Sequence, residues 1–339
     1  AHYRAEDSDV AFLTDAAIEV LGRWPDRAML HCNWLRPHPP MTAPRPYHRL
    51  VDPDEVAIPA RPTDLAQVAV THPYFELTVP GRSMTEYLQR RSRIEDVEER
   101  DDRRLRATYY GLCAEVDTHL GRLVEELKRR GDYDSTLIIF TSDHGDALGD
   151  QWIYGRRGPF DGHFRVPCIV RDPRPVADPA RGTVVDDFTA NIDLLPTICE
   201  AMGVDVPEAV EGRSLLDLLH RPAATAESTD LRGADWPRTG VRGADWPRTH
   251  VRGADWPRTG VRGDMSWDDH LRSSVRAGAG GAAVDRRFSV VRTATHRLVV
   301  FPTLPPMLFD LVEDPLERID RGRDPAYAGL RRDLEALLH

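Results

Sequence analysis

The clearest pattern of apolar and polar positions lies between Asp101 and Gly131. Apolar side chains recur there at steps of three or four residues, at Leu105, Tyr109, Leu112, Val116, Leu120, Leu123 and Leu127. This spacing places them on one face of an α-helix. Acidic residues at the start and the basic run Lys128 to Arg130 at the end match the helix dipole, and Gly131 is a typical stop. The pattern therefore predicts one long amphipathic helix.

A short apolar run that ends in polar residues follows this helix. Thr136 to Thr141 contains Leu-Ile-Ile-Phe and leads into Ser142-Asp143-His144-Gly145-Asp146. Such a run, without helical spacing, is typical of a buried strand in a parallel sheet. In open α/β sheets, ligands bind just beyond the carboxyl ends of the strands. Asp143 and His144 occupy that position.

Weaker patterns predict the other elements. Helices are expected after the capping pair Ser8-Asp9, over Ile192 to Met202 and over Leu330 to Leu338. Strands are expected at Met29–Leu35, Val166–Val170, Phe288–Arg292, Arg297–Phe301 and Met307–Leu311. Residues 41–80 hold many prolines without a sustained period, which favours a long ordered surface loop.

A tandem repeat interrupts the chain near residue 230. Gly-Ala-Asp-Trp-Pro-Arg-Thr starts at Gly233, Gly243 and Gly253, and a decayed copy starts at Gly263. Each copy carries one large apolar side chain, too little to fill a core layer, so an irregular or mobile insertion is expected; a Trp-Pro-Arg ligand array is the alternative. The predicted domains are an α/β core over 1–222, this insertion over 223–285, and a C-terminal antiparallel subdomain with a closing helix over 286–339.

Composition limits the partners. The 339 residues are 41% hydrophobic and 29% charged, with 45 Lys+Arg against 55 Asp+Glu and a net charge of -10. No basic block interleaved with aromatic residues offers a nucleic-acid surface, and no apolar stretch approaches the ~20 residues that span a bilayer. Four scattered cysteines, expected to be buried reduced thiols, favour the cytoplasm: Cys32, Cys113, Cys168 and Cys199. Secretion and a homo-oligomeric state stay open.

Three groups of residues suggest a reaction centre. Asp143 and His144 are metal-ligand types, and Gly145 permits the backbone turn that both need in order to reach one ion. His38 follows another predicted strand, in Arg36-Pro37-His38-Pro39-Pro40, and Arg156-Arg157 follow the Asp-His pair. A cation, an imidazole and a guanidinium together suit phosphoryl or sulfuryl transfer. The ordinary alternatives are a charged surface turn, solvated arginines and a histidine that braces a proline-rich turn.

The same residues resemble a known family. Thr-Ser-Asp143-His144-Gly145-Asp146-Ala-Leu-Gly-Asp, with Arg156 and Phe164-Arg-Val-Pro167, is similar to the sulfatase family of the alkaline phosphatase superfamily. The phosphonate monoester hydrolase/arylsulfatase branch is the most similar. Further matching segments are Arg36 to Pro40, Tyr109 to Gly111 with Glu115 to Asp117, Asp193 to Thr197, Gly212 to Leu215, Leu304 to Leu311 and Asp314 to Glu317.

The resemblance implies a fold and an activity. The fold would be α/β and alkaline-phosphatase-like, with a mixed, mostly parallel sheet flanked by helices and a small C-terminal antiparallel sheet. The activity would be metal-dependent hydrolysis of sulfate, phosphonate or phosphate esters, with a small anionic ester as substrate. Asp143 and His144 would bind one divalent metal (Mn, Ca, Zn or Fe, with Mn or Ca favoured). His38 and Arg156 would contact the substrate oxygens, Arg156 standing where the family usually has lysine.

One part of the family pattern is not found in this sequence. The family's first strand carries metal-binding Asp residues, and a following Cys-x-Pro-x-Arg motif supplies the formylglycine nucleophile. Cys32-Asn-Trp-Leu-Arg36 has similar spacing but lacks the proline. We therefore expect an N-terminally truncated, incomplete enzyme with no nucleophile of its own, the formylglycine lying in the missing part. The alternatives are a non-catalytic remnant or pseudoenzyme, and a Trp-repeat interaction protein.

Overall fold

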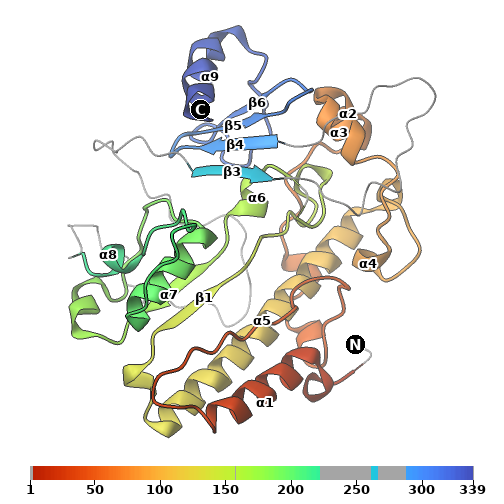
Figure 1. Cartoon of the computed structure of the whole chain (residues 1–339). Coiled ribbons are helices and arrows are strands. Elements are labelled where there is room, and N and C mark those ends of the chain that lie inside the picture. Colours follow the sequence, from red (N-terminus) through yellow and green to blue (C-terminus); the bar gives the residue numbers. More distant parts are fainter. Residues whose placement is uncertain (1–2, 157, 222–260, 266–287, 339) are drawn as a thin grey trace.

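The structure is a computed structural model that describes residues 3–156, 158–221, 261–265 and 288–338 (Figure 1). Its longest element is the helix α5 (Glu99–Arg130), which confirms the long helix expected here. The helix ends at Gly131, whose φ of 81° is left-handed. Helix α1 (Asp9–Leu21), capped by the Ser8 side chain on the Ala11 amide, packs along α5 through a cluster of apolar residues: Ala17, Leu21, Leu123 and Leu127.

The strand that leads into Asp143 lies beside α5 and is less buried than expected. Strand β1 (Ile138–Thr141) pairs antiparallel with β2 (Cys168–Arg171), and this pair is the sheet that the described residues form there. All four residues of β1 are half-buried, and Ile169 of β2 is 62% exposed. The predictions of a fully buried strand and of parallel pairing are therefore wrong for these residues. A strand is buried on both faces only where a layer of structure covers each face. In the described chain, helix α5 covers one face of β1, where Ile138 packs against Leu123 and Leu127.

The predicted strand Met29–Leu35 has no regular secondary structure and belongs to no sheet of the described residues. Its alternate side chains do face the interior, because Leu30, Cys32 and Trp34 pack against the cluster between α1 and α5. No neighbouring strand in the described part of the chain offers a hydrogen-bond ladder at this position. The strand predicted at Met29–Leu35 is therefore wrong for the described chain.

Residues 41–80 hold more helix than the expected loop. They form 3-10 turns at Tyr47–Arg49 and Pro53–Glu55, then the short helices α2 (Leu65–Thr71) and α3 (Pro73–Thr78), and α4 (Thr85–Leu88) follows. Asp64 caps α2 by accepting the Ala66 amide, and the His72 ring caps α3 by accepting the Tyr74 amide. These local caps stabilise helices that are too short for a sequence period to reveal.

Three short helices follow β1. Helix α6 (Asp161–Phe164) precedes β2, and α7 (Leu194–Met202) confirms the helix expected at 192–202, ending at Gly203 with a left-handed φ of 65°. Helix α8 (Leu216–Leu219) closes this part. Further 3-10 turns lie at Ala5–Asp7, Ile94–Asp96, Tyr133–Ser135, Asp150–Trp152, Pro175–Ala180, Asn191–Asp193, Pro325–Tyr327 and Ala336–Leu338.

The C-terminal part is an antiparallel sheet in the order β3-β4-β5-β6. Strands β4 (Phe288–Arg292), β5 (His296–Val300) and β6 (Met307–Asp310) confirm the predicted hairpin and third strand. Helix α9 (Ala328–Glu335) covers one face, and the other face joins the main core. Strand β3 (Val261–Met265) lies within the predicted irregular insertion and pairs with the free edge of β4, so irregular structure is wrong there. The three full repeats lie outside the described residues.

Two compositional expectations can be compared with the structure. All four cysteines are free thiols, but Cys168 is exposed in β2 and the others are half-buried, so full burial was wrong. Among the described residues, no helix has both the length and the apolar composition needed to cross a membrane.

Candidate functional site

Asp143 and His144 converge at the end of β1. The Asp143 Oδ2 and His144 Nε2 atoms lie 3.6 Å apart, and the His144 amide donates to Asp143 Oδ1 at 2.9 Å. The chain therefore turns directly after the strand. Gly145 is needed there because a Cβ atom would lie 2.1 Å from the Gly162 carbonyl oxygen, a contact that no side chain tolerates. Close approach of α6, rather than a left-handed φ, requires this glycine.

The hydrogen bonds of the His144 ring leave one nitrogen free to bind a metal. Nδ1 lies 2.9 Å from the Gly145 carbonyl oxygen and donates its proton to it. Nε2 then carries the lone pair, which faces Asp143 Oδ2 and accepts from Arg156 Nη1 at 3.4 Å. Metal-binding histidines typically donate their second N–H to a carbonyl in this way. The Asp143 side chain is 83% exposed, so its carboxylate is accessible from solvent.

The backbone of the strand end is fixed by a residue that the sequence did not single out. Asn191 Nδ2 donates to the carbonyl oxygens of both Ser142 and Asp143, each at 3.1 Å. The Ser142 hydroxyl donates to the His144 carbonyl oxygen at 2.8 Å. The one available signal for Asn191 was its place two residues before Asp193, at the start of a segment that resembles the family.

The loop that carries Arg156 is stabilised by hydrogen bonds to the Asp146 side chain. Asp146 Oδ1 accepts hydrogen bonds from the amides of Leu148 and Gly155, at 2.9 Å and 2.8 Å. Since Gly155 directly precedes Arg156, these bonds join the two ends of the loop. Burial raises the pKa of Asp146 above its usual range. Asp146 was part of the predicted motif, but no pattern in the sequence indicated this role.

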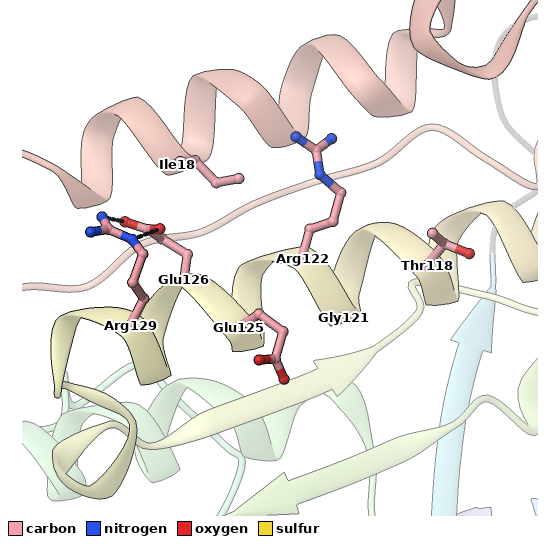
Figure 2. A pocket seen from close by; sticks show the side chains of 7 residues that line it. All are labelled: Ile18, Thr118, Gly121, Arg122, Glu125, Glu126 and Arg129. Atoms are coloured by element: carbon pink, nitrogen blue, oxygen red, sulfur yellow. Dashed lines mark hydrogen bonds and ion pairs between the residues drawn. The ribbon is translucent and has the colours of Figure 1, made fainter.

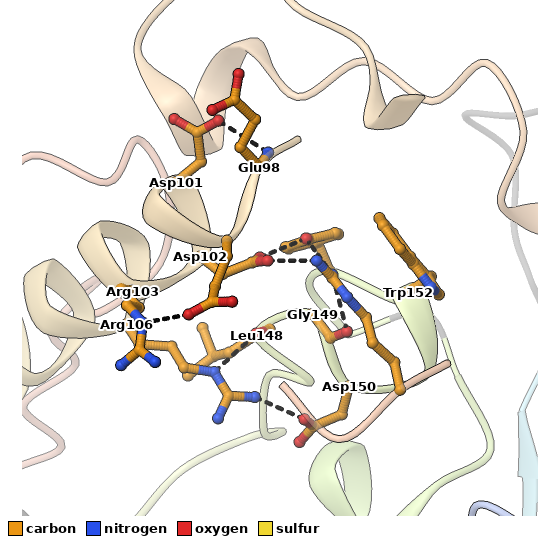
Figure 3. A network of polar contacts seen from close by, with 12 residues as sticks. Glu98, Asp101, Asp102, Arg103, Arg106, Leu148, Gly149, Asp150 and Trp152 are labelled. Carbon is orange, nitrogen blue, oxygen red and sulfur yellow. Dashed lines mark hydrogen bonds and ion pairs between the residues drawn. The ribbon is translucent and has the colours of Figure 1, made fainter. Parts of the chain in front are cut away.

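The same loop is anchored on α5 by a buried polar network (Figure 3). Arg61 is paired with Asp102 and lies 3.5 Å above the Trp152 ring, and the Tyr154 hydroxyl donates to Asp102 at 2.6 Å. Arg106 donates to Asp150 at 2.6 Å. Desolvation raises the pKa of Asp102, against the opposing effect of its hydrogen bond from Tyr154 and the nearby guanidinium of Arg61. This network makes the Arg156 loop a rigid part of the core.

His38 is placed by a different loop. Its Nδ1 lies 2.6 Å from the Pro39 carbonyl oxygen, and the side chain is exposed. Arg36 holds this loop by donating to the Pro40 carbonyl oxygen at 2.9 Å, and its Nε lies 3.3 Å from Asp9 Oδ1. The structure thus brings Asp143, His144 and Arg156 together, whereas the hydrogen bonds of His38 in the described chain stay within its own loop. Its role stays a prediction, and Arg157 lies outside the described residues.

The donor set at the strand end is small. Within residues 3–156, 158–221 and 288–338, no group of three or more His, Cys, Asp or Glu side chains could hold a metal ion. Among these residues, Asp143 and His144 would therefore offer a metal ion two side chains. A hollow of about 470 Å³ lies elsewhere, between α1 and α5, with the ion pair of Glu126 and Arg129 at one end (Figure 2). Its lining contains none of the predicted site residues.

A second histidine, His163, is buried next to Gly145. The His163 side chain packs on Gly158, and burial lowers the pKa of His163 to about 4, so the ring is neutral at pH 7. Its backbone carbonyl accepts the Gly145 amide at 2.9 Å. His163 was not predicted as a site residue, because a lone histidine in a short helix has no recognisable pattern.

Comparison with known proteins gives consistent matches. The family model described as Sulfatase matches residues 4–204. The multifunctional alkaline phosphatase superfamily protein PehA of Trinickia caryophylli is 33% identical over 336 residues, covering 97% of this chain and 58% of PehA. An arylsulfatase of Clostridium perfringens is 33% identical over 123 residues, 36% of this chain and 26% of that protein.

Two crystal structures have a similar fold. The phosphonate monoester hydrolase of Agrobacterium radiobacter superposes with a TM-score of 0.79 at 29% identity, covering 99% of this chain and 61% of that one. A phosphonate monoester hydrolase from Silicibacter pomeroyi gives 0.75 at 33% identity, covering 99% and 59%. The chain spans about three fifths of the length of PehA and of these two hydrolases.

Proposed function

Because this chain belongs to the sulfatase family and has the alkaline-phosphatase-like fold of that family, we propose that it is part of a metal-dependent hydrolase of sulfate, phosphonate or phosphate esters. The single observation that carries this proposal is the convergence of Asp143, His144 and Arg156 at the end of β1. The imidazole Nε2 of His144 lies there 3.6 Å from a carboxylate oxygen of Asp143 and 3.4 Å from a guanidinium nitrogen of Arg156. Few surface turns present these three groups together.

Each side chain has a separate role in the proposal. Asp143 and His144 Nε2 hold the divalent ion, which when bound polarises an ester oxygen. Arg156 binds two non-bridging oxygens of the sulfuryl or phosphoryl group through its planar fork. Its length fixes the substrate in a geometry that differs from the one a lysine allows. His38 donates to a substrate oxygen or to the leaving group.

The ligand types support a choice of metal. One carboxylate suits Mn²⁺ and Ca²⁺, whereas the imidazole nitrogen shifts the preference toward Mn²⁺, Zn²⁺ or Fe²⁺. Mn²⁺ is compatible with both donors, and we propose it as the first ion to test. The substrate is a small anionic ester; with a formal net charge of -10 and no basic-aromatic surface, nucleic acid is not a partner in this proposal.

The number of ligands supports an incomplete centre. A hard divalent ion takes about six donor atoms, and Asp143 and His144 supply two or three of them. We propose that the remaining donors and a formylglycine nucleophile come from polypeptide beyond these 339 residues. The chain alone should then bind Mn²⁺ weakly and turn over substrate slowly.

Two measurements test the proposal. The first is turnover of nitrophenyl sulfate, a nitrophenyl phosphonate and a nitrophenyl phosphodiester with Mn²⁺, where we expect rates near those of buffer. The second is paramagnetic broadening of the His144 ring signals by Mn²⁺, which we expect for the wild type and not for Asp143→Ala. His31→Gln is the matched control, because His31 is an exposed histidine outside the site.

The outcomes separate the two candidate functions. Clear Mn²⁺-dependent turnover that Asp143→Ala abolishes would refute the incomplete centre and leave a complete enzyme. Absence of broadening at His144 would refute the metal site and favour the second candidate, a non-catalytic remnant of the same fold. The 83% exposure of Asp143 is the observation that favours this second candidate, since bound metal ligands are usually sheltered.

A further inference from the structure

The C-terminal sheet reaches the candidate site through a buried charged cluster. Arg297 of β5 has a side chain only 1% exposed, and the Glu317 side chain is 5% exposed. Arg297 Nε lies 2.7 Å from Glu317 Oε1, an ion pair without hydrogen-bond geometry. The second guanidinium nitrogen pairs with the Asp161 carboxylate, which Arg292 of β4 also contacts at 3.2 Å. Two arginines and two carboxylates thus meet here, with Arg297 and Glu317 buried and Arg292 and Asp161 half-buried.

This cluster hydrogen-bonds to one short segment of backbone, Pro159 to Asp161. Arg297 Nη1 donates to the Pro159 carbonyl oxygen at 2.6 Å, and Glu317 Oε2 accepts the Asp161 amide at 2.7 Å. Glu317 also accepts, through its backbone oxygen, the Gln151 side chain at 2.8 Å. The cluster therefore contacts both the start of α6 and the loop that carries Arg156.

Helix α6 also contacts the backbone turn at His144 and Gly145 directly. The His163 carbonyl oxygen accepts the Gly145 amide at 2.9 Å, and the Gly162 backbone approaches Gly145 so closely that only glycine fits. Gly145 directly follows His144 and also supplies the carbonyl oxygen that binds His144 Nδ1. An unbroken series of direct contacts thus runs from Arg297 through α6 to the ring of His144.

A buried ion cluster is poor evidence for stability, because apolar side chains of similar volume often stabilise as well or better. Unlike apolar contacts, however, the hydrogen bonds of such a cluster are directional, and each one fixes the position of one backbone group. We propose that Arg297 and Glu317 are positioning residues, which hold α6 so that Gly145 and the His144 ring keep their geometry. The part of this inference that concerns metal binding rests on the proposed function.

The main test is native-state hydrogen exchange, which needs no metal. In Arg297→Met we expect the Gly145 amide to exchange roughly tenfold faster or more, relative to the Leu112 amide of α5. Leu298→Ala is the matched control. Leu298 is the next residue of β5 and fully buried, but it packs toward Leu334 of α9 rather than toward α6. It should accelerate exchange of both amides equally.

Arg297→Lys provides a second variant in case Arg297→Met does not fold. It keeps the charge but cannot reach Pro159, Asp161 and Glu317 together, so the same selective acceleration at Gly145 is expected. Unchanged exchange at Gly145 in a folded variant, or a rise equal to that at Leu112, would overturn the inference. Mn²⁺ broadening of His144 should also need about threefold more metal in these variants. If wild-type protein shows no broadening, the proposed metal site fails while the exchange data still decide on positioning.

Discussion

Two regions that meet at the end of β1 differ in how strongly the rest of the protein fixes them: the segment that follows Gly145, and the strand pair β1-β2. On one side, the segment from Asp146 to His163 is fixed by buried polar groups, from Asp102 on α5 and from Arg297 on β5. On the other side, the strand itself is half-buried, its neighbour Ile169 is 62% exposed and Asp143 faces solvent.

This difference indicates which part of the site is organised in advance. Protein groups already hold the backbone that leads to Arg156 and the His144 ring, through the Gly155 amide and the Gly145 carbonyl oxygen. Asp143 has no such enclosure, and the sheet beside it has unpaired edges in the described residues. Substitutions on the first side should therefore change stability strongly, and substitutions on the second should not.

The largest effect is expected from Asp102→Ala. This change removes the carboxylate that pairs with the buried Arg61 guanidinium and accepts the Tyr154 hydroxyl, and breaking a buried ion pair typically costs about 3–5 kcal/mol. Asp117→Ala, on the exposed face of the same helix, is the control and should cost less than about 0.5 kcal/mol. Urea unfolding of both variants measures the difference. Similar midpoints would show that the network does not hold the loop.

The next effect concerns the contact between α6 and the turn at Asp143 and His144. In Gly145→Ala the new methyl group meets the Gly162 carbonyl oxygen, so α6 must move, at a cost of about 2–3 kcal/mol. Gly121→Ala makes the same change in the interior of α5, where a Cβ atom meets nothing within 4 Å. It should stabilise by about 0.5–1 kcal/mol. Equal effects of the two substitutions on thermal unfolding would contradict the close approach.

A third effect depends on pH. His163 has a pKa of about 4 in the folded protein, below its ordinary value of 6.5, so the unfolded chain binds more protons between these values. Stability is therefore complete above pH 6.5 and falls as the pH drops toward 4, by about 2 kcal/mol at pH 5. His163→Gln should remove this loss, and His31→Gln should not. Unfolding at pH 7 and pH 5 checks this; an unchanged slope in His163→Gln would show that other groups control it.

The sequence predicted well wherever a pattern repeated over many residues. The period of α5 records which face of the helix is buried, and a long pattern averages out exceptions. The Asp143-His144 pair was also predictable, because its position after an apolar run is local information. The family resemblance came from short motifs and was independent of any fold prediction.

The parts that could not be predicted depend on contacts distant in sequence. Asn191 reaches the carbonyl of Ser142 across 49 positions, and Arg297 reaches Pro159 across 138. No local pattern marks such contacts. The burial of β1 was overestimated for a related reason, since an apolar run shows that a strand can be buried but not whether the described chain covers it.

The smallest effect is expected on the exposed side. Ile169→Thr replaces a side chain that is 62% exposed, so little apolar area is lost and stability should change by less than about 0.5 kcal/mol. Ile94→Thr makes the same substitution at a position with no exposure and should cost about 2–4 kcal/mol. A large effect at Ile169 in this chain alone would mean that β2 is covered in solution, by a second copy for example. Repeating the measurement over a range of protein concentrations would identify that case, because stability would then rise with concentration.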